Sequence, residues 1–183
     1  MNETIKNIMQ RNSCRDFEAA PLTDAQVKTL VEAALAAPSA QNLQPWHVTV
    51  VTDKKFIEEM DSSGMEAMAA MEDKMYYNRI KERGGKLFYN APCIVVISTS
   101  EAPWAPLDSG IQCQNVVLAA EAMGLGSCIV GLLRVPLDGP KGGDFKKRLK
   151  FPDGYDFAVS ILVGTVKTGK EPHELDFGKV DYV

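Results

Sequence analysis

The stretch from residue 11 to residue 17 combines two arginines with a hydroxyl side chain, in the order Arg11-Asn12-Ser13-Cys14-Arg15-Asp16-Phe17. If the chain is extended here, residues 11, 13 and 15 share one face, because strand side chains alternate. Two guanidinium groups around a hydroxyl suit a phosphate dianion, since the guanidinium fork binds phosphate oxygens in pairs. A solvated surface run with Asp16 as an ion-pair partner explains the same residues, and spacing alone favours this plainer interpretation.

A second polar segment lies between two prolines and contains Ser39, Gln41, Asn42 and Gln44. Amide side chains both donate and accept hydrogen bonds, so a heteroaromatic ligand with carbonyls and ring nitrogens would match them. Taken alone, an ordinary turn between a helix and a strand is the commoner explanation of such residues. The neighbouring Trp46 is typical of a core anchor.

A segment with three glycines follows later in the chain, at Gly124-Leu125-Gly126-Ser127-Cys128-Ile129-Val130-Gly131. It is not a dinucleotide-binding fingerprint, because the third glycine of GxGxxG would fall on Ile129. The segment also follows a helix and enters a strand, which reverses the order that this fingerprint requires. We expect Gly124 to end the helix and the strand backbone beyond it to approach a flat ligand.

Other reacting side chains are few. The two histidines, His47 and His173, stand alone, and the four cysteines form no CxxC pair that would indicate zinc. Arg15 would lower the pKa of the neighbouring Cys14 thiol, but no base or resolving cysteine accompanies it. An enzyme with this sequence would therefore depend on a cofactor that carries the reaction itself.

Five methionines lie at mostly helical spacing, namely Met60, Met65, Met68, Met71 and Met75. Packing in a core or an interface is the plainer interpretation of such a stripe. The alternative is an adaptable wall over a site that accepts varied substrates.

Composition limits the remaining possibilities. The chain has 183 residues, 45% of them hydrophobic and 24% charged, which predicts one folded domain over residues 1–183. A net charge of −4 disfavours nucleic acid and anionic membrane surfaces as general partners. No apolar run approaches the ~20 residues of a membrane span, and the start of the chain lacks the apolar core of a secretion signal. Free thiols then indicate a cytoplasmic protein.

Hydrophobic periodicity predicts interleaved helices and strands, and hence an α/β or α+β layered fold. Thr23 and Gln26 have the form of a capping box, so a helix begins there and ends before Pro38. The helix expected over 108–123 is apolar on nearly every side and should be central. Further helices are expected over 3–11, 54–82 with a break near 62–64, and 143–149, and strands over 47–52, 94–97, 128–132 and 157–166.

Taken together, these segments resemble the nitroreductase family of FMN-dependent oxidoreductases. The resemblance rests on Arg-x-Ser-x-Arg-x-Phe at residues 11–17 and on Pro-Ser-x-x-Asn-x-Gln-Pro-Trp at residues 38–46. It continues in the Gly-Leu-Gly-Ser-Cys-x-x-Gly segment at 124–131, which follows a helix holding Asp108, Gln112 and Asn115. Gly164 after the last strand fits as well, so the resemblance spans nearly the whole chain.

The resemblance implies an α+β fold, an α-β-α sandwich on a mainly antiparallel sheet. It also implies an intertwined homodimer that holds two FMN molecules at the subunit interface. In such proteins the counterparts of Arg11, Ser13 and Arg15 hold the phosphate and the pyrimidine edge of the flavin. A second group of counterparts comes from the other subunit, namely Pro38, Ser39, Ala40 and Asn42, with Gln44 as a further hydrogen-bonding candidate. The backbone of Ser127, Cys128 and Ile129 would line the isoalloxazine, with Gly131 nearby.

The sequence departs from the family pattern in places. Asn12 stands where arginine or histidine is frequent, and Ala40 stands where serine is common. A late basic residue often reaches the phosphate in the family, and Lys170 and His173 are both candidates. Lys86 is a further candidate for the pyrimidine edge.

The activity implied by the resemblance is transfer of reducing equivalents from NADH or NADPH to nitroaromatic, quinone or related conjugated acceptors by a ping-pong mechanism. No side chain then acts as a nucleophile, because the flavin carries the chemistry. Two alternatives remain open. One is a different reaction on the same fold, such as dehalogenation, flavin fragmentation or metabolite dehydrogenation, and the other is flavin storage without turnover.

Overall fold

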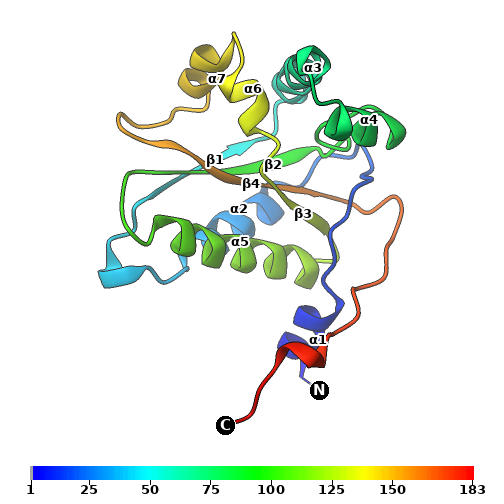
Figure 1. Ribbon diagram of the computed structural model, residues 1–183. Helices are drawn as coiled ribbons and strands as arrows, with labels where there is room; N and C mark the ends of the chain where they lie inside the picture. Colours follow the sequence, from blue (N-terminus) through cyan, green and yellow to red (C-terminus); the bar gives the residue numbers. More distant parts are fainter. Residues whose placement is uncertain (1) are drawn as a thin grey trace.

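The computed structural model describes residues 2–183 (Figure 1). Its helices and strands are, in chain order, α1 (Glu3–Gln10), α2 (Asp24–Leu35), the short 3-10 helix η1 (Ala40–Asn42), β1 (Trp46–Val51), α3 (Lys54–Ala70), α4 (Met75–Glu82), β2 (Cys93–Thr99), α5 (Ala105–Ala122), β3 (Gly126–Val130), α6 (Arg134–Asp138), α7 (Gly142–Arg148), β4 (Asp156–Gly164) and η2 (Phe177–Lys179).

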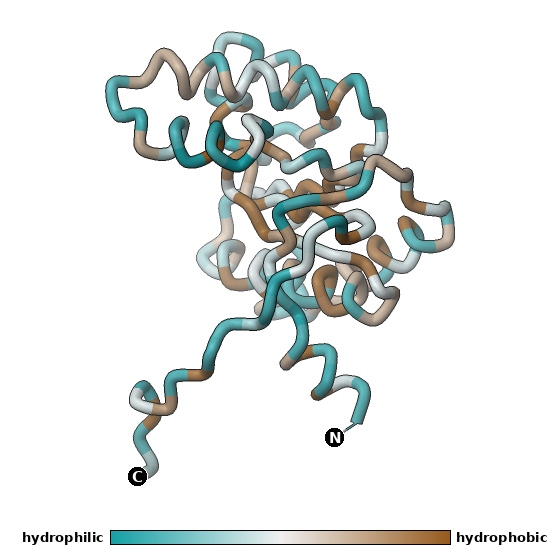
Figure 2. The backbone as a smooth tube through the Cα atoms, turned by 90° about the vertical axis from the view of Figure 1, so that its right-hand side faces the viewer, coloured by the Kyte–Doolittle hydropathy of each residue, from teal (hydrophilic) through white to brown (hydrophobic). Residues whose placement is uncertain are grey.

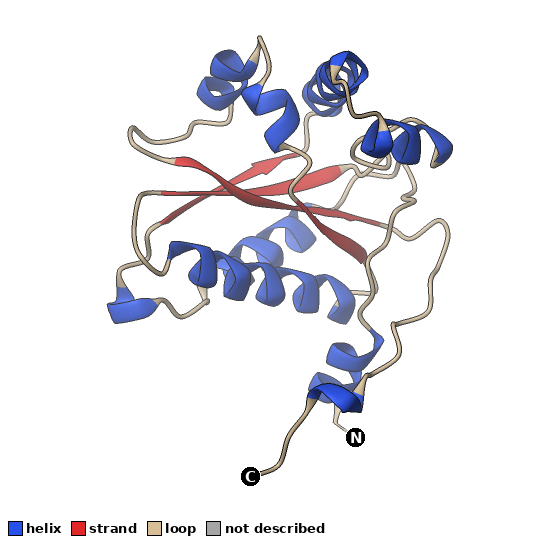
Figure 3. Cartoon of the chain, in the orientation of Figure 1, coloured by secondary structure: helices blue, strands red, loops and turns tan. Residues whose placement is uncertain are grey.

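The strands of residues 2–183 form one four-stranded sheet in the order β1-β2-β4-β3, and each neighbouring pair is antiparallel. Helices cover both faces, with α3, α4, α6 and α7 on one side and α2 and α5 on the other (Figures 1 and 3). The predicted α+β sandwich on an antiparallel sheet is confirmed. Strand β3 lies at one edge of the sheet, which leaves its outer side available to other segments.

Strand β2 shows how the sheet divides the core in two. Ile94 and Val96 pack among the residues beneath α3, whereas Val95 and Ile97 pack with α2 and α5. All four side chains are fully buried, since successive strand residues point to opposite faces and both faces are covered. Burial on both faces explains why residues 94–97 of β2 are all apolar.

The ends of two helices follow local chemistry that the sequence displays. The Thr23 hydroxyl accepts from the Gln26 N–H at 3.3 Å and the Gln26 amide oxygen accepts from the Thr23 N–H at 2.9 Å, which confirms the capping box. Helix α5 ends at Gly124, whose φ of 70° is left-handed and favours glycine. The Leu125 N–H then reaches back to the Ala120 carbonyl at 2.9 Å, as in a Schellman motif.

Two expectations about element boundaries are wrong, and one short helix was not expected. Helix α3 runs unbroken through residues 62–64, and the break falls at 71–74 instead. Gly64 marks close packing, because a Cβ at this position would lie 2.6 Å from the Leu87 side chain and 3.2 Å from Pro136. Strand β3 begins and ends two residues earlier than predicted, and the short helix α6 was not expected.

The methionine stripe divides where α3 ends. Met60 and Met68 are buried and Met65 packs against the same core, so core packing accounts for these three. Met71 and Met75 lie beyond the helix and are 45% and 59% exposed. A continuous methionine wall is therefore not present.

Helix α1 and the C-terminal segment both extend away from the sandwich on the same side of the molecule (Figure 1), and they diverge from each other toward their ends (Figure 2). The apolar side chains of α1 are uncovered in this chain, with Ile5, Ile8 and Met9 each about 45% exposed. Among the described residues, no helix combines the length and the apolar character that crossing a membrane requires.

Candidate functional site

The arginine-containing segment lies along the outer edge of β3. Ser13 forms a parallel bridge with Ser127, and the Cys14 N–H donates to the Ser127 carbonyl at 2.9 Å. The segment therefore extends the sheet by one short pairing at its otherwise open edge. This pairing fixes the alternation of residues 11–15, with Cys14 directed into the core and Arg15 exposed.

The side chains of Arg11, Ser13 and Arg15 all act on the thiol of Cys128. Burial raises the pKa of this thiol, whereas the positive charge of Arg15, a hydrogen bond with Ser13 and the charge of Arg11 all oppose the rise. The three groups thus lie on one side of the segment, as the alternation predicts. Two guanidinium groups and a hydroxyl gathered at one point form a donor set that suits a phosphate group.

Cys14 does not have the activated thiol that its neighbour Arg15 suggested. It is 3% exposed, and burial raises its pKa, with only a minor opposing effect from Arg15. A buried thiol of raised pKa is unreactive at neutral pH, because the thiolate is the nucleophile. Cys14 acts as a core residue beneath the arginine cluster.

The outer part of β3 offers an open strip of backbone next to the arginine cluster. Ser127 and Cys128 are buried, whereas Ile129 is 43% exposed and Gly131 is exposed. Nothing lies within 4 Å of the position that a Cβ on Gly131 would take. A flat ring can approach such a strip closely, and the guanidinium and hydroxyl donors beside it have the chemistry that a phosphate group requires.

The loop after Pro38 is ordered largely by its own side chains. The Ser39 hydroxyl accepts from the Gln44 N–H at 2.9 Å, and the Gln44 amide donates to the Asn42 side chain at 3.0 Å. Gln41, Asn42 and Gln44 all have positive φ between 47° and 54°. Left-handed conformations cost non-glycine residues of order 1–3 kcal/mol each and cluster at functional sites. The exposed amides are therefore held in one arrangement in advance of any ligand.

Helix α5 anchors this loop through three polar residues on one face. The Asp108 carboxylate accepts from the Ala40 N–H at 3.2 Å, and the amides of Gln112 and Asn115 donate to two carbonyls near the end of α2 at 3.2 and 3.1 Å. The spacing i, i+4, i+7 places the three side chains in a row along the helix. Asp108 thus positions the loop, and Gln112 and Asn115 hold the end of α2 from which the loop begins.

The loop and the arginine cluster lie at opposite ends of α5. Ala40 is bonded to the first turn of the helix, whereas Ser13 pairs with a strand that begins after its last turn. At 1.5 Å per residue, about 20 Å of helix separates Asp108 from the last residue of α5. Figure 1 shows the same separation, with η1 beyond one end of α5 and α1 beyond the other. Within one chain the loop does not border the cluster.

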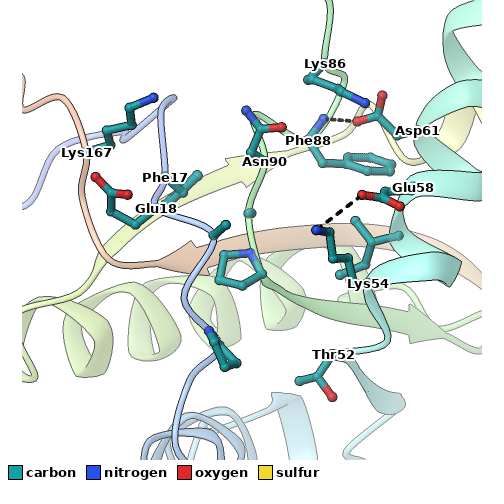
Figure 4. Close-up of a pocket in the computed structure, with 15 residues that line it drawn as sticks. Phe17, Glu18, Thr52, Lys54, Glu58, Asp61, Lys86, Phe88, Asn90 and Lys167 are labelled. Atoms are coloured by element: carbon teal, nitrogen blue, oxygen red, sulfur yellow. Dashed lines mark hydrogen bonds and ion pairs between the residues drawn. The ribbon is translucent and has the colours of Figure 1, made fainter.

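The remaining predicted residues lie in several places. Asn12 bonds weakly back to the Gln10 carbonyl at 3.5 Å, while Lys170 and His173 are exposed in the C-terminal segment. Lys86 lines a cavity of about 550 Å³ that is separate from the thiol of Cys128 (Figure 4). Lys167 lines the same cavity, and its N–H donates to the Asp16 carbonyl at 3.0 Å. Sequence reasoning did not single out Lys167, which lies three residues after the end of β4.

Comparison with known proteins decides the family. The model of the nitroreductase family matches residues 8–165 of this sequence. The chain belongs to the nitroreductase family. The match covers the arginine segment, the Pro38 loop and the whole sheet, so the resemblance inferred from the motifs is confirmed.

Solved structures of nitroreductases are similar over the entire chain. A nitroreductase with bound FMN from Desulfitobacterium hafniense DCB-2 is 43% identical, with a TM-score of 0.97 over 100% of this chain and 99% of that one. A second nitroreductase with bound FMN, from Bacteroides fragilis NCTC 9343, is 25% identical with a TM-score of 0.88 over the full length of both chains.

Sequence relatives include longer proteins. The NADPH-flavin oxidoreductase of Vibrio harveyi is 35% identical over 136 residues. The matched region covers 73% of this chain and 55% of the Vibrio protein, so this chain spans about half the length of that relative.

Proposed function

We propose that the chain is an FMN-dependent oxidoreductase that passes reducing equivalents from NADH or NADPH to nitroaromatic, quinone or related conjugated acceptors. The observation that carries the proposal is the full-length likeness, at 43% identity, to a nitroreductase with bound FMN. The gathering of two guanidinium groups and a hydroxyl at the open edge of β3 supports it independently.

The residues of the site have separate tasks in this proposal. Arg11, Ser13 and Arg15 hold the phosphate and adjoining flavin atoms, and the backbone from Ser127 to Gly131 lines the ring. Lys86 provides a positive charge at the pyrimidine edge. Bound FMN would supply the hydride-transfer chemistry, with NAD(P)H and the acceptor using the open face in turn. Lys167 joins Lys170 and His173 as a candidate for the phosphate.

A homodimer is part of the proposal, because one chain contains two halves of a site that do not meet. The Pro38 loop and the arginine cluster lie at opposite ends of α5, so a loop that contacts a cofactor at the cluster comes from a second copy. Uncovered apolar side chains on α1 and in the C-terminal segment, such as Ile8 and Phe177, support such an assembly, since large exposed apolar patches mark interaction sites.

A cytoplasmic location and a single FMN-binding domain over residues 1–183 complete the proposal. The four cysteines are buried free thiols, and thiols persist where the compartment is reducing. NADH and NADPH would be available as donors in the same compartment.

The absorption spectrum of the purified protein, repeated anaerobically after addition of NADH or NADPH, tests the proposal. We expect a flavin spectrum that bleaches with either donor and returns when a nitroaromatic or quinone is added. Bound flavin that neither donor reduces indicates flavin storage, and reduced flavin that no such acceptor reoxidises indicates a different reaction on this fold. A protein that cannot be reconstituted with FMN contradicts the proposal altogether.

A further inference from the structure

The cavity that contains Lys86 has an unusual buried group at its wall. Phe17, Ile57 and Phe88 provide apolar lining, and charged side chains surround them (Figure 4). Asp61, on α3, also lines this cavity and is only 5% exposed. Burying a carboxylate is costly unless it is hydrogen-bonded or paired, and none of the roles assigned so far requires one here.

The Asp61 carboxylate is bound to a turn 27 residues away in the sequence. Its Oδ2 accepts from the Phe88 N–H at 2.9 Å, a buried hydrogen bond that Figure 4 marks with a dashed line. Burial and, more weakly, the charge of Glu58 raise the pKa of Asp61, while the N–H groups of Phe88 and Leu87 and the ammonium of Lys86 oppose the rise. The same carboxylate therefore holds the backbone of the turn and attracts the Lys86 side chain.

The turn over residues 86–90 needs support from outside. Tyr89 and Asn90 have φ values of 52° and 62°, and two consecutive left-handed residues without glycine are strained. Leu87 and Phe88 are fully buried, so the turn cannot shift without disturbing the core. Gly64, three residues after Asp61, permits the contact, because any Cβ there would overlap the Leu87 side chain.

The turn also reaches the segment that holds the arginines. The Phe17 N–H donates to the Tyr89 carbonyl at 3.4 Å, and Phe17 ends the stretch that begins at Arg11. One buried carboxylate on α3 thus lies behind a turn that carries Lys86 and contacts the arginine segment. An apolar residue at 61 would remove both the acceptor of the Phe88 N–H and the negative charge that attracts Lys86.

We propose that Asp61 is a positioning residue, which fixes the Lys86 ammonium where it stabilises the negative charge of the reduced flavin. This inference rests on the proposed function, which places FMN beside Lys86. A preorganised positive charge stabilises an anionic state more than a mobile one does, because no reorganisation is needed when the charge forms. Asp61 therefore raises the preference of the site for reduced over oxidised FMN.

The test compares the reduction potential of bound FMN in wild type, Asp61→Asn and Lys86→Gln proteins. Asparagine keeps an oxygen that accepts from the Phe88 N–H but no longer attracts the ammonium. We expect Asp61→Asn to lower the ratio of reduced to oxidised FMN affinity about tenfold, which is about 30 mV for a two-electron couple. Lys86→Gln should lower it at least as far, and the double variant should match Lys86→Gln.

Glu58→Gln is the matched control, because Glu58 lies one turn earlier on α3 and lines the same cavity but is exposed and paired with Lys54 at 3.8 Å. Removing this charge should leave the potential nearly unchanged. The sign of the Asp61→Asn effect is decisive. A mere loss of negative charge near the flavin raises the potential, and a purely structural role lowers stability while leaving the potential where it was. Either result overturns the inference.

If Asp61→Asn does not fold, Asp61→Glu keeps the charge but displaces it by one methylene, and the potential should still fall, by a smaller amount. An unchanged potential in a folded Asp61→Glu protein also counts against positioning. Wild-type protein that binds no FMN overturns the proposed function together with this inference. If FMN binds normally and is reduced by NAD(P)H, but its reduction potential is the same in the residue-61 variants as in wild type, only the inference is overturned.

Discussion

Replacing Arg11 or Arg15 by alanine should weaken FMN binding in a predictable order. Arg11 is half-buried, whereas Arg15 is exposed and its charge is better screened by water. A hydrogen bond to a charged group contributes roughly 1.5–3 kcal/mol, and each 1.4 kcal/mol is a factor of about ten in affinity. We therefore expect the dissociation constant of FMN to rise about 100-fold for Arg11→Ala and about tenfold for Arg15→Ala.

Titration of apoprotein with FMN, followed by flavin fluorescence at fixed ionic strength, measures both constants. Lys28→Ala is the control, because Lys28 is an exposed lysine on α2 paired only with Glu32, and its loss changes the net charge equally. The affinity of this control should match wild type. If both arginine variants bind FMN as tightly as the control does, the phosphate assignment is wrong.

Three further predictions concern the scaffold of the site. Asp108→Ala removes the buried acceptor of the Ala40 N–H and should lower the free energy of unfolding by about 1–3 kcal/mol in urea denaturation; an unchanged value contradicts the anchoring role. Gly124→Ala should cost about 1 kcal/mol at its φ of 70°, whereas Gly143→Ala, in an exposed helical position, should not destabilise. Asp156→Asn should destabilise at pH 7, because two basic side chains lower the pKa of Asp156. The difference in free energy of unfolding between wild type and Asp156→Asn should shrink as pH falls below about 4, where the carboxyl of the unfolded chain becomes protonated. A difference that stays constant with pH contradicts this prediction.

Local signals in the sequence were reliable where neighbouring residues alone decide the structure. Thr23 and Gln26 satisfy each other's backbone, and Gly124 supplies the left-handed residue that ends α5, so both were visible in advance. The predicted break at 62–64 failed for the opposite reason. Gly64 is required by the close approach of Leu87, and a contact between residues far apart in sequence leaves no local trace.

The candidate site was predictable in its chemistry but not in its geometry. Arginine and serine alternation correctly placed three donors on one side of the segment at residue 11. The same sequence could not reveal that α5 holds the Pro38 loop a helix length away, because that distance depends on the hydrogen bond between Asp108 and Ala40. Nor could the sequence reveal that burial has a larger effect than Arg15 on the pKa of the Cys14 thiol.

Complementation between two defective chains tests most directly whether one flavin is held by two copies of the protein. One chain carries Arg11→Ala and Arg15→Ala, the other carries Ser39→Ala and Asn42→Ala, and mixed dimers are isolated with two affinity tags. If the arginines and the loop of each site come from different chains, one site of the mixed dimer is intact and the other carries both defects. We predict that mixed dimers hold about half of the wild-type FMN while each parent holds little. Mixed dimers that bind no more FMN than their parents contradict the shared site.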